Sequence, residues 1–190
     1  MPTSSSPAQI AVFGSSSVQP DEPAYGEARR LGAELARRGA TVMTGGYDGA
    51  MAACSQGAHE VGGHVVGVTV EMFEGRGPVN RWVRERVHTE TLFERLDYLV
   101  HRADGFVAVA GSVGTLTEVF LIWSLLGVEA RKAAPLVLMG TQWHAWLDLH
   151  RGPGFVPERL FQLIEVADTP EEAADRVMAR LASTVPTAGE

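Results

Sequence analysis

The stretch G-F-V-A-V-A-G-S-V-G-T-L-T-E-V-F-L-I-W-S-L-L-G, residues 105–127, is typical of a buried strand, a glycine-rich turn and a helix. The first turn of that helix carries Thr115 and Glu118. In a glycine-rich turn, no side chains block access to the backbone. The unpaired N–H groups at the start of the following helix can therefore bind an anion. A carboxylate so close to that site would repel a bound phosphate unless it acts on another part of the ligand. The segment therefore predicts one strand–turn–helix unit of a nucleotide-binding α/β protein.

Short apolar runs alternate with segments of helical periodicity along the whole chain. Strands are expected at residues 9–13, 41–44, 64–70, 105–110, 135–139 and 163–166. Helices are expected near residues 22–38, 50–61, 90–102, 115–126, 142–149 and 170–181, whereas residues 73–86 have the character of a loop. Such alternation predicts right-handed crossovers and a parallel sheet with helices on both faces. The expected fold is one Rossmann-like, doubly wound α/β domain at 9–183, with flexible tails at 1–8 and 184–190.

The composition is that of an ordinary globular protein, with 45% hydrophobic and 21% charged residues. A formal net charge of −7 argues against a large basic surface for nucleic acid. Because Cys54 is the only cysteine, an internal disulfide and a cysteine-based zinc site are excluded. No apolar stretch is long enough to span a membrane, and the N-terminus lacks the regions of a signal peptide. We therefore expect a cytoplasmic protein with no membrane partner.

The single lysine, Lys132, limits the possible cofactors. A Walker-type G-x-x-x-x-G-K-[ST] loop cannot exist in a chain with no lysine at such a position. Pyridoxal chemistry would need Lys132 as its Schiff-base partner. Lys132 precedes the predicted strand at 135–139, whereas ligands of open α/β sheets bind at the carboxyl ends of the strands. Both cofactor schemes are therefore disfavoured.

Three glycine-rich turns follow three predicted strands, and in a parallel sheet all three lie at one edge. A single turn would be explained by the steric demands of a tight connection, but three that converge predict a pocket for phosphate and sugar. The G-x-G-x-x-G spacing of dinucleotide sites is missing, which favours a mononucleotide. The candidate binding residues in these turns are Gly14, Ser15, Gly45, Gly46, Gly49, Gly111, Ser112, Val113, Gly114 and Thr115.

Two side chains near this edge allow both a structural and a functional interpretation. The spacing Thr115-x-x-Glu118 matches a capping box, and helical spacing turns Glu118 away from the apolar stripe of its helix. Arg95 lies on the flank of an apolar helix face, beside Leu99. A flanking arginine usually extends its head into water, but it could instead hold a phosphate or ribose over the sheet edge. Both interpretations stay open for each residue.

Several motifs together resemble the LOG family, the cytokinin-activating phosphoribohydrolases often mislabelled as lysine decarboxylases. The family signature P-G-G-x-G-T-x-x-E is similar to A-G-S-V-G-T-L-T-E at residues 110–118. Its G-G-G-x-x-G-L-M resembles T-G-G-Y-D-G-A-M at 44–51, and its F-C-G-S-S resembles V-F-G-S-S at 12–16. Its M-x-x-R-K is similar to L-F-E-R-L at 92–96. The likeness spans roughly residues 10–155.

The resemblance implies that Arg95 and Glu118 are the catalytic pair and that the glycine turns, with Met51, hold the nucleotide. It implies hydrolysis of the N-glycosidic bond of a nucleoside 5′-monophosphate, a cytokinin nucleotide or AMP, to free base and ribose 5-phosphate. No metal or organic cofactor is required for this reaction. Departures from the family pattern, such as Ser112 and Leu96, leave an alternative open: a non-catalytic carrier of a nucleotide or of molybdenum cofactor.

The helix at 115–127 is apolar around nearly its whole circumference, which predicts burial on two sides. A second copy of the same helix would supply the other side, so we expect a homodimer. The alternative is that the C-terminal segments of the same chain cover it. The six histidines form no metal-binding pattern, and we interpret them as surface or structural residues.

Overall fold

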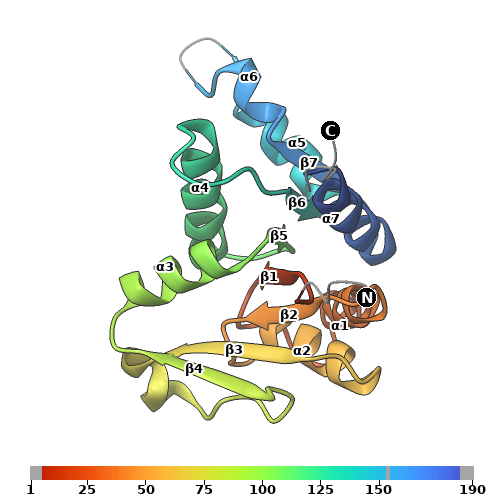
Figure 1. The fold of residues 1–190 in the computed structure, drawn as a ribbon, viewed down its shortest axis with the longest axis vertical. Helices are drawn as coiled ribbons and strands as arrows, with labels where there is room; N and C mark the ends of the chain where they lie inside the picture. The colour runs from red at the N-terminus through yellow and green to blue at the C-terminus, as the bar shows by residue number, and fades with distance from the viewer. Residues whose placement is uncertain (1–5, 153–154, 185–190) are drawn as a thin grey trace, which may run out of the picture.

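The computed structural model describes residues 6–152 and 155–184, and its sheet has seven parallel strands. The order across the sheet is β4-β3-β2-β1-β5-β6-β7 (Figure 1). The strands are β1 (Gln9–Phe13), β2 (Thr41–Thr44), β3 (Val65–Val70), β4 (Glu85–Thr89), β5 (Gly105–Ala108), β6 (Leu136–Met139) and β7 (Ile164–Ala167). The predicted Rossmann-like, doubly wound α/β fold is confirmed.

Helices connect the strands and cover both faces of the sheet. They are α1 (Pro23–Arg37), α2 (Ala50–Glu60), the 3₁₀ helix η1 (Glu71–Arg76), α3 (Leu92–Arg102), α4 (Val113–Gly127), α5 (Gln142–Leu149), α6 (Glu158–Phe161) and α7 (Pro170–Thr184). Figure 1 shows α1, α2 and α7 on one side of the sheet, with α3 and α4 on the other.

Strand β1 illustrates how the sheet serves two hydrophobic cores. Successive side chains of a strand point to opposite faces. Ile10 and Val12 accordingly pack in the core beneath α1, α2 and α7, whereas Ala11 and Phe13 pack beneath α3 and α4. Because both faces are covered, residues 10–13 of the strand are all apolar, as expected for a central parallel strand.

The chain reverses its direction of growth across the sheet at β1. It builds β2, β3 and β4 on one side of β1, then crosses over to build β5, β6 and β7 on the other. The final residue of β1, Phe13, is paired with Ala108 at the end of β5. Ligands of open α/β sheets bind in the crevice outside the carboxyl ends of the strands at such a switch point. The glycine turns that follow β1, β2 and β5 all lie there.

The prediction of a loop at residues 73–86 holds for 77–84 but is wrong at both ends of the range. Residues Glu71–Arg76 form η1, and Glu85–Thr89 form β4, which pairs in parallel with β3. Strand β4 lies at the edge of the sheet, and most of its E-R-V-H-T side chains are exposed or half-buried. Charged residues are typical of edge strands because they discourage pairing with another chain. A search for apolar runs therefore missed this strand.

Helix α4 is covered from two directions within the chain, but one face stays open. The residues of α4 that join the core are Val119, Ile122, Trp123 and Leu126. Helix α6 covers a second part, where Trp123 Nε1 donates a hydrogen bond to the carbonyl oxygen of Leu160 at 2.8 Å. Phe120 remains 41% exposed, and Val113 and Val128 are more exposed still. The alternative of cover by C-terminal segments is thus correct in part.

The predicted domain bounds lie near the two ends of the chain. The tails expected at 1–8 and 184–190 fall mostly outside the described residues, so those bounds stay a prediction. Among the helices of residues 6–152 and 155–184, none combines the length and the apolar character needed to cross a membrane.

Candidate active site

A cavity of about 420 Å³ opens beyond the carboxyl ends of β1, β2 and β5. The predicted residues that line it are Gly14, Gly45, Met51, Arg95, Ser112, Gly114, Thr115 and Glu118. The lining residues that sequence reasoning missed are Val12, Phe13, Ser16, Tyr47, Asp48, Phe73 and Gly77. The two proposed catalytic side chains and all three turns therefore meet at one cavity.

Five predicted binding residues, Ser15, Gly46, Gly49, Gly111 and Val113, are not among those that line the cavity. The backbone of Ser15 ties the turns together, since its N–H donates to the carbonyl of Ala110 at 3.2 Å. Gly49 has a φ of +67°, a conformation that favours glycine, and a Cβ there would overlap the backbone of Ser15. A Cβ at Gly111 would overlap the side chain of Thr115. Ser15, Gly49 and Gly111 thus shape the turns through their backbone and close packing.

Arg95 is the most deeply placed charge of the site. It comes from α3, and only 6% of its surface is exposed. Its Nε donates to the carbonyl of Val68 at 2.7 Å and its Nη2 to the carbonyl of Gly45 at 3.1 Å. The guanidinium carbon lies 5.7 Å from the ring centre of Tyr47 and 5.6 Å from that of Phe73. The alternative of an arginine head extended into water is wrong, because these contacts fold the side chain over the sheet edge.

The guanidinium of Arg95 keeps a donor for a ligand. Burial lowers the pKa of Arg95, but an arginine in a protein remains protonated. Nη1 makes no hydrogen bond to any group in the described part of the chain, and Arg95 lines the cavity. A Cβ at Gly45 would overlap Nη2, so glycine at this position is what allows the guanidinium to approach the turn.

Glu118 lies half-buried in the second turn of α4 and lines the same cavity. Burial raises the pKa of Glu118 to about 7, and the positive charge of Arg95 opposes that rise. Within the described residues, the carboxyl group of Glu118 makes no hydrogen bond or ion pair. A carboxyl group that is half-ionised near neutral pH and faces a cavity is suited to accept a proton or to stabilise a cation.

The capping-box interpretation of Thr115 and Glu118 is wrong. Helix α4 begins two residues earlier, at Val113, with Ser112 as its N-cap residue and no side-chain cap. The N–H groups of Val113, Gly114 and Thr115 donate to no group in residues 6–152 and 155–184. Free N–H groups at the start of a 15-residue helix attract anions, and the helix dipole adds to that attraction. The turn is thus suited to hold a phosphate.

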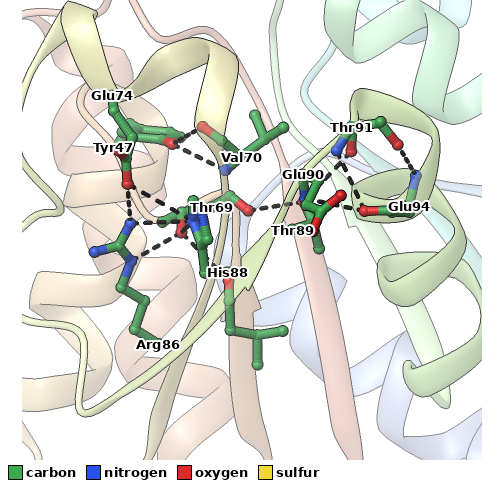
Figure 2. Close-up of polar contacts among 11 residues, drawn as sticks. Tyr47, Thr69, Val70, Glu74, Arg86, His88, Thr89, Glu90, Thr91 and Glu94 are labelled. Carbon is green, nitrogen blue, oxygen red and sulfur yellow. Dashed lines mark hydrogen bonds and ion pairs between the residues drawn. The ribbon is translucent and has the colours of Figure 1, made fainter.

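Tyr47 lines the cavity and lies in a predicted glycine turn, but sequence reasoning did not name it as a candidate. Its hydroxyl donates to the carbonyl of Val70 and accepts from the Val70 N–H, each at 3.0 Å (Figure 2). These bonds fix the end of β3, from which η1 begins. The ring of Tyr47 lies edge-on to that of Phe73, at 5.9 Å between centres. Tyr47 therefore links the glycine turn to the aromatic wall of the cavity.

A polar network on the outer side of η1 anchors the same wall. Arg86 Nη2 lies 2.6 Å from a carboxylate oxygen of Glu74, and Arg86 Nε donates to the hydroxyl of Thr69 at 3.0 Å. The Nδ1 atom of His88 lies 3.1 Å from Arg86 Nη2 and 3.3 Å from the Thr69 hydroxyl (Figure 2). The network joins η1 to β3 and β4 and so helps to position Phe73.

The chain is similar to members of one known protein family. A family model described as "Possible lysine decarboxylase" matches residues 51–177. The cytokinin riboside 5′-monophosphate phosphoribohydrolase of Mycobacterium tuberculosis is 32% identical over 154 residues, which cover 77% of this chain and 81% of that protein. The enzyme with the same name from Mycobacterium marinum is 34% identical over 148 residues, 75% of this chain and 79% of that protein.

Among solved structures, the molybdenum cofactor carrier protein of Chlamydomonas reinhardtii matches with a TM-score of 0.69 and 26% identity. The match covers 93% of this chain and 99% of that one. A family model that spans most of the chain and relatives more than 30% identical over three quarters of it support one conclusion. This chain is a divergent member of the LOG family.

Proposed function

We propose that this protein hydrolyses the N-glycosidic bond of a nucleoside 5′-monophosphate, a cytokinin nucleotide or AMP. The observation that carries the proposal is the pair formed by Glu118, whose pKa is about 7, and the buried Arg95 at one cavity. The relatives named as phosphoribohydrolases support the same reaction class. The bond between C1′ and the base nitrogen breaks, and its electron pair leaves with the base.

Cleavage of that bond leaves an oxocarbenium-like cation at the sugar. The Glu118 carboxylate would stabilise this cation and accept a proton from the water whose oxygen bonds to C1′. The products are the base, which takes up a proton, and ribose 5-phosphate. The free Nη1 of Arg95 would hold the ribose phosphate or the departing base. The N–H groups of residues 113–115 would bind the 5′-phosphate.

The experiment compares the wild type with Glu118→Gln on a panel of nucleoside monophosphates, with free base measured by chromatography. We expect base release by the wild type and a loss of about 100- to 10,000-fold in the variant, the usual size of a general-base effect. Glu171→Gln, an exposed change in the first turn of α7, is the matched control and should retain full activity. Undiminished release in Glu118→Gln would overturn the proposed role.

A second candidate function is a carrier that binds its ligand without turnover. The match to the molybdenum cofactor carrier protein and the departures from the family signature at Ala110, Ser112 and Leu96 favour it. Changes at such positions can abolish catalysis and leave ligand binding intact. The departures therefore argue against turnover more strongly than against binding. AMP that raises the melting temperature and is recovered intact would support a carrier. Rapid release of adenine would exclude it.

We also propose that the open face of α4 forms a homodimer with a second copy of the chain. This face carries the exposed apolar residues Val113, Phe120 and Val128, with Ser124 near its middle. Apolar side chains exposed along one side of a helix favour association. A substitution at Ile122 would not test this proposal, because the Ile122 side chain is fully buried in the core of its own chain.

Ser124→Glu places a charge on the open face of α4 without removing any core contact. Light scattering coupled to size exclusion should give a dimer for the wild type and a monomer with an unchanged melting temperature for the variant. Arg30→Glu, an exposed change on α1, is the control and should stay dimeric. A wild-type monomer would contradict the proposal.

A further inference from the structure

The turn at Gly45–Gly49 has three successive carbonyl groups that are already occupied. The carbonyl of Gly45 accepts from Arg95 Nη2 at 3.1 Å. The carbonyl of Gly46 accepts from the backbone N–H of Asn80 at 2.9 Å, and that of Tyr47 accepts from Asn80 Nδ2 at 3.0 Å. Asn80 therefore fixes the orientation of two consecutive peptide groups in this turn.

The N–H groups that belong to these two peptides are those of Tyr47 and Asp48. No peptide bond among the described residues is cis, so each N–H points away from the carbonyl of its own peptide and hence away from Asn80. Neither N–H donates a hydrogen bond to any described residue. Tyr47 and Asp48 line the cavity, whereas Asn80 does not. The turn thus presents two free donors on the cavity side.

Asp48 adds an acceptor at the same place. Its side chain is exposed, lines the cavity, and makes no hydrogen bond or ion pair with the rest of the described chain. The charged residues that line the cavity in the described ranges are Asp48, Glu118 and the single cation Arg95. An anion beside Asp48 would be repelled, which separates this turn from the phosphate-binding start of α4.

A hydroxyl group satisfies both features of the turn, because it can donate one hydrogen bond and accept others. A carboxylate accepts from hydroxyl groups, and backbone N–H groups donate to them. A pair of adjacent hydroxyls suits a carboxylate with two oxygens. Among the parts of a nucleoside monophosphate, the ribose 2′,3′-diol has this chemistry, whereas the phosphate has only acceptors at neutral pH.

We propose that the Gly45–Gly49 turn, held by Asn80, binds the ribose 2′,3′-diol through the Asp48 carboxylate and the N–H groups of Tyr47 and Asp48. Asp48 is then a residue that determines specificity for ribonucleotides, and Asn80 is a positioning residue. The inference rests on the proposed function only in taking the ligand to be a ribose phosphate. A site built to bind a hydroxyl rejects the analogue that lacks it, because its polar groups are left without a partner.

Titration calorimetry with ribose 5-phosphate and 2-deoxyribose 5-phosphate tests the proposal without any need for turnover. We expect the wild type to bind ribose 5-phosphate about ten- to a hundredfold more tightly, the effect of one hydrogen bond to a charged group. Asp48→Ala should abolish this preference by weakening ribose 5-phosphate alone. Asp21→Ala, an exposed aspartate outside the cavity, is the control and should keep the wild-type ratio.

Asn80→Asp tests the positioning role, because it replaces the donor to the Tyr47 carbonyl with a carboxylate oxygen. We expect a smaller preference for ribose 5-phosphate over 2-deoxyribose 5-phosphate. The affinity for inorganic phosphate should stay unchanged. A ratio that stays at the wild-type value in Asn80→Asp would overturn this role. A merely structural defect would weaken both sugar phosphates and inorganic phosphate together, which also contradicts it.

The outcomes separate this inference from the proposed reaction. Base release by the wild type combined with an unchanged affinity ratio in Asp48→Ala would overturn the inference and leave the reaction standing. A wild-type preference for ribose 5-phosphate that Asp48→Ala abolishes, without base release from any nucleotide, would support the inference and overturn the reaction. Failure of the wild type to bind either sugar phosphate would overturn the inference.

Discussion

The turns at Gly45–Gly49 and at residues 110–115 both connect a strand to a helix, but they differ in how their backbone is used. In the first turn, three carbonyl groups accept hydrogen bonds from Arg95 and Asn80. A Cβ at Gly45 would overlap Arg95 Nη2. In the second, the N–H groups at the start of α4 are free, and an added Cβ at Gly114 would meet nothing within 4 Å. Gly45 thus serves packing in the first turn, whereas Gly114 leaves space for a ligand in the second.

Among changes at the two turns, the largest expected effect comes from Arg95, whose guanidinium donates to the carbonyl of Gly45 in the first turn. Arg95→Met keeps an unbranched apolar side chain but removes the guanidinium, with its charge and its hydrogen bonds to Val68 and Gly45. We expect base release to fall by about 100- to 1,000-fold, as when a preorganised donor is lost from an active site. Arg102→Met, an exposed arginine at the end of α3, is the control. Equal activity of the two variants would contradict the assignment.

Replacing one glycine of each turn by alanine compares the two turns directly. Gly45→Ala forces a Cβ against Arg95 and Met51, so we expect a loss of stability of about 1–3 kcal/mol and roughly tenfold lower activity. Gly114→Ala should leave the melting temperature unchanged and weaken ribose 5-phosphate by roughly tenfold, because the methyl group would occupy ligand space. Calorimetric melting and titration measure both. A destabilised Gly114→Ala with normal affinity would reverse the contrast.

The pH dependence of the reaction tests the carboxylate that lies between the turns. Burial raises the pKa of Glu118 to about 7, so the ionised form predominates only above that pH. We expect kcat/KM to rise about tenfold per pH unit below pH 7 and to level off above it. A flat profile between pH 5 and pH 8 in an active wild type would show that Glu118 does not act as the carboxylate.

The smallest expected effect is on stability. Between the ordinary pKa of 4.5 and the folded pKa of about 7, the folded chain keeps a proton on Glu118 that the unfolded chain has lost. Glu118 therefore contributes less stability as the pH rises through this range. Glu118→Gln cannot ionise and should be more stable than the wild type by roughly 1–3 kcal/mol at pH 8, with no gain at pH 4. Denaturant titrations at both pH values measure it, and an equal gain at both would contradict this origin.

The fold could be predicted because its central strands are buried on both faces and therefore form continuous apolar runs. Strand β4 could not, because an edge strand such as E-R-V-H-T lacks that signal. The meeting of the three glycine turns at one edge followed from the parallel order alone.

The placement of individual side chains was harder to predict because it depends on tertiary contacts. The spacing T-x-x-E alone does not decide the role of its residues: Thr91 and Glu94 form a true capping box, whereas Thr115 and Glu118 do not, because α4 starts at Val113. The burial of Arg95 depends on the carbonyls of Val68 and Gly45, which helical periodicity alone does not reveal. Asp48 lies in a predicted turn, and only the position of the cavity identified it as a candidate ligand group.

The proposal that one turn binds the phosphate and the other the ribose is tested most directly by a crystal structure of Glu118→Gln with AMP bound. We expect the 5′-phosphate within hydrogen-bond distance of the N–H groups of residues 113–115. The ribose hydroxyls should contact Asp48, and C1′ should lie between Arg95 and residue 118. A phosphate seated on the Gly45–Gly49 turn, or a nucleotide bound outside the cavity, would contradict the account.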